Sequence, residues 1–100
     1  MEYVFEVIDK SGRKIHLSKE RWTHINTEHP ELANYFEELK ETLVNPIKIT
    51  TYIYNKNVKY HYKYLKEPNL PTKYLFVIAK YLNGKGYVST VFIARKIIRR

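Results

Sequence analysis

The dipeptide Asn45-Pro46 divides this chain into two stretches with different hydrophobic periodicities. Before it, four apolar residues recur at spacings of four, three and four: Leu32, Phe36, Leu39 and Leu43. This is the apolar stripe of an amphipathic helix, which ends at the proline because proline restricts the preceding residue and donates no backbone hydrogen bond. After it, short runs typical of strands alternate with turn sequences. Helices and sheet are therefore segregated along the chain, as in the α+β class.

Local turn and capping signals turn this division into an order of elements. We expect strands at residues 3–8, 14–17, 47–54, 58–65, 74–82 and 87–94. Two helices lie between the second and third strands, the first capped by Ser18 and ending near Glu28, the second starting at Pro30. The predicted fold is an N-terminal β-hairpin, two helices and then a four-stranded antiparallel meander, in one domain spanning residues 1–100.

Charge is distributed unevenly along the chain. Residues 1–47 carry six basic and nine acidic side chains, whereas residues 48–100 carry twelve basic side chains and one acid, Glu67. With a net charge of +8 overall, the strand-rich half has a positive field that attracts a polyanion and speeds its encounter with the protein. This distribution favours nucleic acid as the partner, with a role in solubility as the alternative.

Alternation along the strands indicates where the basic residues lie. Because the helices cover one face of the sheet, we expect the basic residues of the sheet at its open face and edges. The fourth predicted strand has His61 and Lys63 on one face and three tyrosines on the other: Tyr60, Tyr62 and Tyr64. We interpret the tyrosines as core residues in preference to base-stacking residues, and we keep Tyr62 as a candidate substrate contact.

The residue inventory excludes several classes of chemistry. The chain has no cysteine, and its single aspartate, Asp9, falls in a predicted turn. Disulfide scaffolds, thiolate metal sites and two-metal nucleases need residues that this chain lacks or scatters. No glycine-rich phosphate-binding motif of the P-loop or dinucleotide type occurs. We therefore expect no metal and no cofactor.

The distribution of apolar residues bears on location. No apolar run approaches the roughly 20 residues that span a bilayer. The first residues, Met1-Glu2-Tyr3-Val4, lack the basic and apolar regions of a signal peptide. We expect a soluble, cytoplasmic protein with no membrane partner.

Metal-free RNA cleavage is a reaction that this inventory can support. The ribose 2′-hydroxyl is itself the nucleophile, so the protein must supply a general base, a cation for the phosphorane charge and a general acid. Histidine, lysine, arginine, tyrosine and threonine provide such groups, and the chain contains four histidines and 18 lysines and arginines.

Two short motifs and several strand segments carry a family resemblance. The most specific piece is Arg21-Trp22-Thr23-His24-Ile25 followed by His29-Pro30-Glu31, and segments at 60–63, 77–80 and 86–92 continue it over residues 14–96. In this order they resemble the phage-associated branch of the barnase/EndoU/colicin/RelE-like (BECR) nuclease superfamily. The resemblance implies two helices before a four-stranded antiparallel sheet. It also implies a metal-independent endoribonuclease, in many members a toxin or phage effector.

The resemblance implies roles for residues of the first helix. His24 would transfer protons, and it shares an arc of the predicted helix with Arg21 and Glu28. Arg21 would bind phosphate, or pair with Glu28 instead. A second histidine, His29 or His61, would complete the acid/base pair, although capping or packing explains His29 equally well.

The strands supply the remaining candidates. Lys63 and Lys80 would neutralise the phosphate, unless they are solvated strand lysines. Thr90 would donate a hydrogen bond to phosphate, or else fill an apolar strand. Arg95 and Lys96, at the start of the basic tail, would attract phosphate without specificity.

Two functions from other classes remain open. The first is a non-catalytic nucleic-acid-binding module, in which the basic sheet face binds without a working acid/base pair. The second is an interaction protein whose basic face docks on an acidic partner, such as a neutralising antitoxin or immunity protein.

Overall fold

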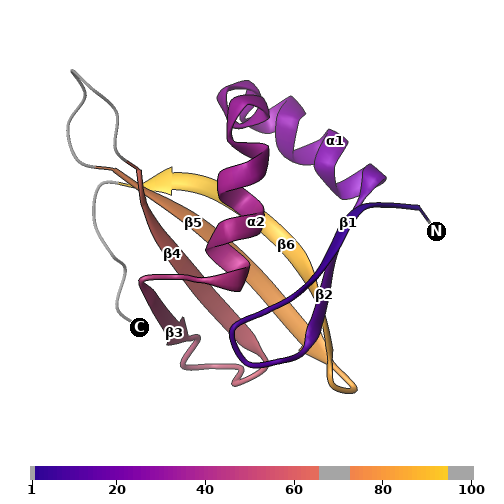
Figure 1. Cartoon of the computed structure of the whole chain (residues 1–100), viewed down its shortest axis with the longest axis vertical. Coiled ribbons are helices and arrows are strands. Elements are labelled where there is room, and N and C mark those ends of the chain that lie inside the picture. The colour runs from indigo at the N-terminus through magenta and orange to yellow at the C-terminus, as the bar shows by residue number, and fades with distance from the viewer. Residues whose placement is uncertain (1, 66–72, 95–100) are drawn as a thin grey trace.

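The structure of the chain, a computed structural model, describes residues 2–65 and 73–94, and the statements below concern those residues. Its elements follow in the order β1 (Tyr3–Ile8), β2 (Lys14–Ser18), α1 (Lys19–Glu28), a 3-10 helix η1 (Pro30–Tyr35), α2 (Phe36–Val44), β3 (Lys48–Thr51), β4 (Val58–Leu65), β5 (Lys73–Leu82) and β6 (Lys85–Ala94). Figure 1 shows both α-helices on one face of a twisted sheet. The architecture is α+β, as predicted.

The sheet is larger than predicted, because the N-terminal hairpin joins it. The antiparallel meander from β3 to β6 is present, but β2 also pairs with β6 in parallel through Ile15↔Gly86 and His16↔Tyr87. The result is a mixed six-stranded sheet in the order β1-β2-β6-β5-β4-β3. Sequence alternation defines strands but not their neighbours, so this parallel contact was not foreseen.

The helical region also differs in detail from the prediction. Ser18 caps α1 as predicted, since its hydroxyl accepts a hydrogen bond of 3.1 Å from the Arg21 backbone N–H. The second predicted helix is divided: η1 begins at Pro30, and the backbone at Tyr35 (φ −115°, ψ 25°) interrupts it before α2. None of the described helices is long and apolar enough to cross a membrane.

The hydrophobic core lies between the helices and the sheet. The stripe predicted from the sequence supplies its helical side, with Leu32, Leu39 and Leu43 buried. The sheet side consists of residues from five strands: Phe5, Ile15, Leu17, Leu65, Leu75, Val77, Ala79, Tyr81, Val88 and Val91. Burial of this apolar surface is the dominant stabilising contribution, at about 25 cal/mol per Å².

The tyrosines of β4 face away from the helices, which reverses the predicted assignment of its two faces. His61 and Lys63 lie on the helix side, where Lys63 Nζ is 3.0 Å from Glu41 Oε1 of α2. On the other face, Tyr62 is fully buried, with its ring centroid 4.5 Å from that of Phe76. The prediction failed because both sets are amphipathic, so alternation alone separates them without saying which faces the helices.

A β-bulge in β6 changes which of its residues share a face. The register runs Lys80↔Tyr87 and Ala79↔Val88, then shifts so that Ile78 pairs with Thr90. Tyr87 and Thr90 are therefore on the open face, although strict alternation would place residues three apart on opposite faces.

We predict that Gly86→Ala destabilises the protein by about 1–3 kcal/mol, the usual cost of overpacking. A Cβ at this position would lie 2.8 Å from Tyr81 Cε1 and 3.2 Å from Ile15 Cγ1. The Tyr81 ring cannot move aside freely, because its hydroxyl bonds Asp9 and the Arg13 guanidinium lies 3.7 Å above it. Urea unfolding measures the effect, with Ser89→Ala on the same strand as the control. Equal stability of the two variants would contradict the close packing.

Candidate active site

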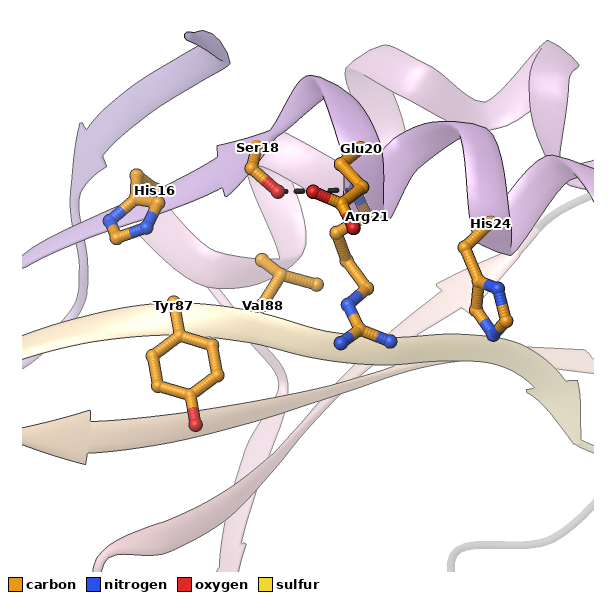
Figure 2. Close-up of a pocket in the computed structure, with 7 residues that line it drawn as sticks. All are labelled: His16, Ser18, Glu20, Arg21, His24, Tyr87 and Val88. Atoms are coloured by element: carbon orange, nitrogen blue, oxygen red, sulfur yellow. Dashed lines mark hydrogen bonds between the residues drawn. The ribbon is translucent and has the colours of Figure 1, made fainter. Parts of the chain in front are cut away.

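A cavity of about 510 Å³ lies where β2 passes into α1, beside β6. Seven residues line it: His16, Ser18, Glu20, Arg21, His24, Tyr87 and Val88. It exists because β2 pairs with β6 over two residues only and then ends at the Ser18 cap, so that α1 rises away from β6. Figure 2 shows the side chains of His16, Arg21, His24 and Tyr87 along this opening.

Helix α1 places two predicted residues, Arg21 and His24, in the cavity. They are three residues apart and therefore neighbours on one helical face. Figure 2 shows the Arg21 guanidinium between Tyr87 and His24, reaching toward β6. His24 is exposed, and its Nε2 lies 3.0 Å from Glu28 Oε1 one turn later, so a carboxylate lies beside the imidazole. The shared arc of Arg21, His24 and Glu28 is thus confirmed.

His16 enters the cavity from the other side, on β2. Its ring stacks on Tyr3 with centroids 4.0 Å apart and planes at 19°. Burial lowers the pKa of His16 below its ordinary value of 6.5; Lys85 lowers it further, and the carboxylate of Glu6 opposes both. The imidazole is therefore neutral at pH 7 and can accept a proton.

Tyr87 forms part of the cavity wall on the open face of the sheet. Its partner in register is Lys80, whose side chain leaves the same face. Thr90 also lies on this face, past the bulge. Lys80 and Thr90 are not among the lining residues, so the structure puts them beside the cavity rather than in it.

Other predicted site residues lie elsewhere. His29 caps the end of α1 and lies 3.6 Å from Glu31, outside the cavity. Lys63 is paired with Glu41 on the helix side of the sheet. Tyr62 is buried on the opposite face from the helices. Arg95 and Lys96 lie outside the described residues. His29, Lys63 and Tyr62 thus share no site with His24.

Sequence reasoning missed three cavity residues with polar side chains, His16, Glu20 and Tyr87. The alternation of Ile15, His16 and Leu17 did carry a signal, because two buried aliphatic neighbours direct the histidine to the other face. Nothing in the sequence indicated that β2 would lie beside β6 and so bring His16 to Tyr87. That pairing is a tertiary contact between segments about 70 residues apart.

A second, smaller cavity of about 240 Å³ surrounds His61 on the helix side of the sheet. Asp9 accepts hydrogen bonds from the Ser11 hydroxyl at 2.6 Å, from the Arg13 N–H at 3.0 Å and from the Tyr81 hydroxyl. Burial alone would raise the pKa of Asp9, but the bonds from Ser11, Tyr81 and the backbone outweigh it and lower the pKa. Burial, with the Asp9 hydrogen bond, raises the pKa of Tyr81.

His61 is the least exposed histidine, at 1% relative exposure, and its Nε2 lies 3.4 Å from the Tyr81 hydroxyl oxygen. Burial lowers its pKa to about 4. The imidazole is neutral at pH 7 and enclosed, so its position suits a structural group better than the alternative acid that the sequence suggested.

A comparison with protein families identifies a match over nearly the whole chain. The family model described as phage-Barnase-EndoU-ColicinE5/D-RelE like nuclease2 matches residues 3–100, nearly the whole chain. Neither a curated protein nor a solved structure matches the chain significantly.

We predict that mild acid destabilises the protein through His61. The unfolded histidine takes up a proton near pH 6.5, whereas the folded one does so near pH 4. The free energy of unfolding therefore falls as the pH drops from 6.5 to 4, by about 3 kcal/mol from this group. Urea unfolding across this range should show a reduced pH slope in His61→Leu. The exposed control His24→Gln should keep it, and equal slopes in all three proteins would refute the assignment.

Proposed function

The chain belongs to the family of phage-Barnase-EndoU-ColicinE5/D-RelE like nucleases, and from that premise we propose that it is a metal-independent endoribonuclease acting at the cavity between α1 and β6. Family membership makes the protein a nuclease with a nucleic acid substrate. RNA specificity and a mechanism based on histidine are the further steps of the proposal. The toxin or phage-effector role, the cytoplasmic location and a neutralising partner stay predictions from the sequence.

One observation carries the proposal: a guanidinium and two imidazoles line a single open cavity. Figure 2 shows His16 on β2 and Arg21 and His24 on α1, so two elements bring the cation and the two imidazoles to one cavity. Phosphoryl transfer needs its attacking and leaving oxygens roughly in line, with proton transfer at each. The two histidines and the arginine that line this cavity can supply the proton transfers and the phosphate-binding cation.

The proposed reaction uses the ribose 2′-hydroxyl as nucleophile. Neutral His16 accepts the hydroxyl proton as the 2′-oxygen forms a bond to the adjacent phosphorus. Arg21 stabilises the charge that develops on the phosphorane oxygens. The bond from phosphorus to the 5′-oxygen breaks, and protonated His24 donates its proton to that oxygen. The products are a 2′,3′-cyclic phosphate and a 5′-hydroxyl.

The surroundings of these three residues support the assignment. Glu28 holds the ring of His24 and balances its charge when it is protonated. The Ser18 hydroxyl accepts a hydrogen bond from the Arg21 backbone N–H, so the cap of α1 lies at the cavity. Lys80 and Thr90, which were predicted phosphate contacts, leave the sheet on the same face as Tyr87. Glu20 also lines the cavity and is the competing candidate for the general base.

We predict that His16→Ala and His24→Ala each lower the cleavage rate about 10²- to 10⁴-fold, the usual contribution of a positioned acid or base. The assay incubates each protein with mixed-sequence RNA in excess EDTA and resolves the product ends. Wild type should leave 2′,3′-cyclic phosphates. His29→Ala is the matched control, because this histidine lies outside the cavity, and it should cleave normally.

The same assay separates the competing assignments. Full activity in His16→Ala, with loss in Glu20→Gln, would transfer the role of base to Glu20. Loss in His29→Ala instead of His24→Ala would contradict the site. Absence of cleavage in wild type, with binding that weakens steeply as salt rises, would favour a non-catalytic nucleic-acid-binding module. If the protein binds RNA no more tightly than a generic cation does, the result would favour an interaction protein that docks on an acidic partner.

We also predict a specific pH dependence. Because the base must be neutral, the cleavage rate rises with pH through the pKa of His16, and its acid limb lies below pH 6.5. Lys85→Gln removes a charge that lowers this pKa and should move the limb to higher pH. Glu6→Gln removes a charge that raises it and should move the limb to lower pH. Measurement of kcat/KM against pH tests both, and shifts of the opposite sign would exclude His16 as the base.

A further inference from the structure

We propose that the ring of Tyr87 is a stacking platform for an unpaired nucleobase, so that the substrate is single-stranded RNA. This inference rests on the proposed function, because it assigns the phosphate next to that base to Arg21. It adds a specificity-determining contact on β6 to the acid/base groups on β2 and α1.

Tyr87 has the exposure that a platform needs. It is 39% exposed and belongs to the wall of the cavity. Among the described residues, the ring contact found for Tyr87 is with His16, at 6.3 Å between centroids and a tilt of 32°. The two described cation–π contacts, Arg13 over Tyr81 and Lys40 over Phe36, do not involve it. A ring face of Tyr87 is therefore left for a ligand.

Tyr87 ends a row of aromatic side chains on the sheet. The row runs across three adjacent strands, from Tyr3 on β1 through His16 on β2 to Tyr87 on β6. Because Tyr87 lies in the two-residue parallel pairing of β2 with β6, its backbone is fixed on the side where α1 begins. A tyrosine side chain has only two χ angles and therefore loses little conformational entropy on binding.

The groups at and beside Tyr87 suit the parts of a nucleotide, because an aromatic ring can stack on a base and a guanidinium can bind a phosphate. An aromatic ring and the Arg21 guanidinium line one cavity, and a nucleotide likewise carries a base and a phosphate (Figure 2). Lys80 pairs with Tyr87 in register, and Lys85 acts on His16 electrostatically, so the surroundings carry further positive charge. Stacking on an aromatic ring needs an exposed base face, which a base inside a duplex does not offer. The combination therefore selects unpaired RNA.

Equilibrium binding of an RNA that cannot be cleaved tests the platform separately from catalysis. The probe is a short fluorescent 2′-O-methyl RNA of mixed sequence, used single-stranded, annealed to its complement, and as a single strand with abasic sites. Tyr87→Leu removes the ring, and Tyr87→Phe keeps the ring but removes the hydroxyl. Tyr54→Leu is the matched control, since Tyr54 is 77% exposed and lies in the turn after β3. Arg21→Gln reports on the phosphate contact.

Stacking on one base is worth about 1–3 kcal/mol, so Tyr87→Leu should weaken single-strand binding about tenfold. Tyr87→Phe and Tyr54→Leu should bind within about twofold of wild type, and Tyr87→Leu should not change binding of the duplex or abasic probes. Weakening in Arg21→Gln with none in Tyr87→Leu would overturn the platform and leave the proposed active site standing. Equal loss in Tyr87→Phe and Tyr87→Leu would assign the hydroxyl, not the ring. Wild-type binding in Arg21→Gln would overturn the proposed site itself.

Discussion

The carboxylate of Asp9 joins the two ends of the fold. It accepts hydrogen bonds from Ser11 and Arg13 within its own turn and from the Tyr81 hydroxyl of β5, so it ties the N-terminal hairpin to the C-terminal meander. The parallel pairing of β2 with β6 spans two residues and would position the hairpin weakly by itself. Since a buried, fully bonded carboxylate loses several contacts at once when it is displaced, this network resists separation of the two segments.

The cavity forms at the point where the contact between the N-terminal hairpin and β6 ends. The hairpin is held against β6 near Gly86 and Tyr87, and the Ser18 cap then starts α1, which diverges from the strand. The divergence opens a gap lined from β2, α1 and β6. It also brings an imidazole that burial keeps neutral to the same opening as an exposed imidazole paired with a carboxylate.

The uneven charge distribution has two structural outcomes. Part of the positive charge of the strands is compensated within the molecule, as when Lys63 pairs with Glu41 of α2. Lys80 lies on the other face, which the helices leave uncovered, and it adjoins Tyr87. A surface of this kind attracts a polyanion to the face on which the cavity opens. The total charge is readable from composition, but the division between compensated and available charge depends on which face each strand residue occupies.

The sequence by itself determined the element types, the N-cap at Ser18, the helical arc of Arg21, His24 and Glu28, and the family resemblance. These depend on local spacing, because capping, helical periodicity and strand alternation act over a few residues. Tertiary structure decided the contribution of His16 and Tyr87, the burial of His61 and the displacement of His29 and Lys63 from the cavity. The parallel contact of β2 with β6 joins distant segments, and the bulge in β6 shifts its register by one residue. Neither the parallel contact nor the bulge can be recognised from hydrophobic periodicity in the sequence, because both arise only when separate strands pair.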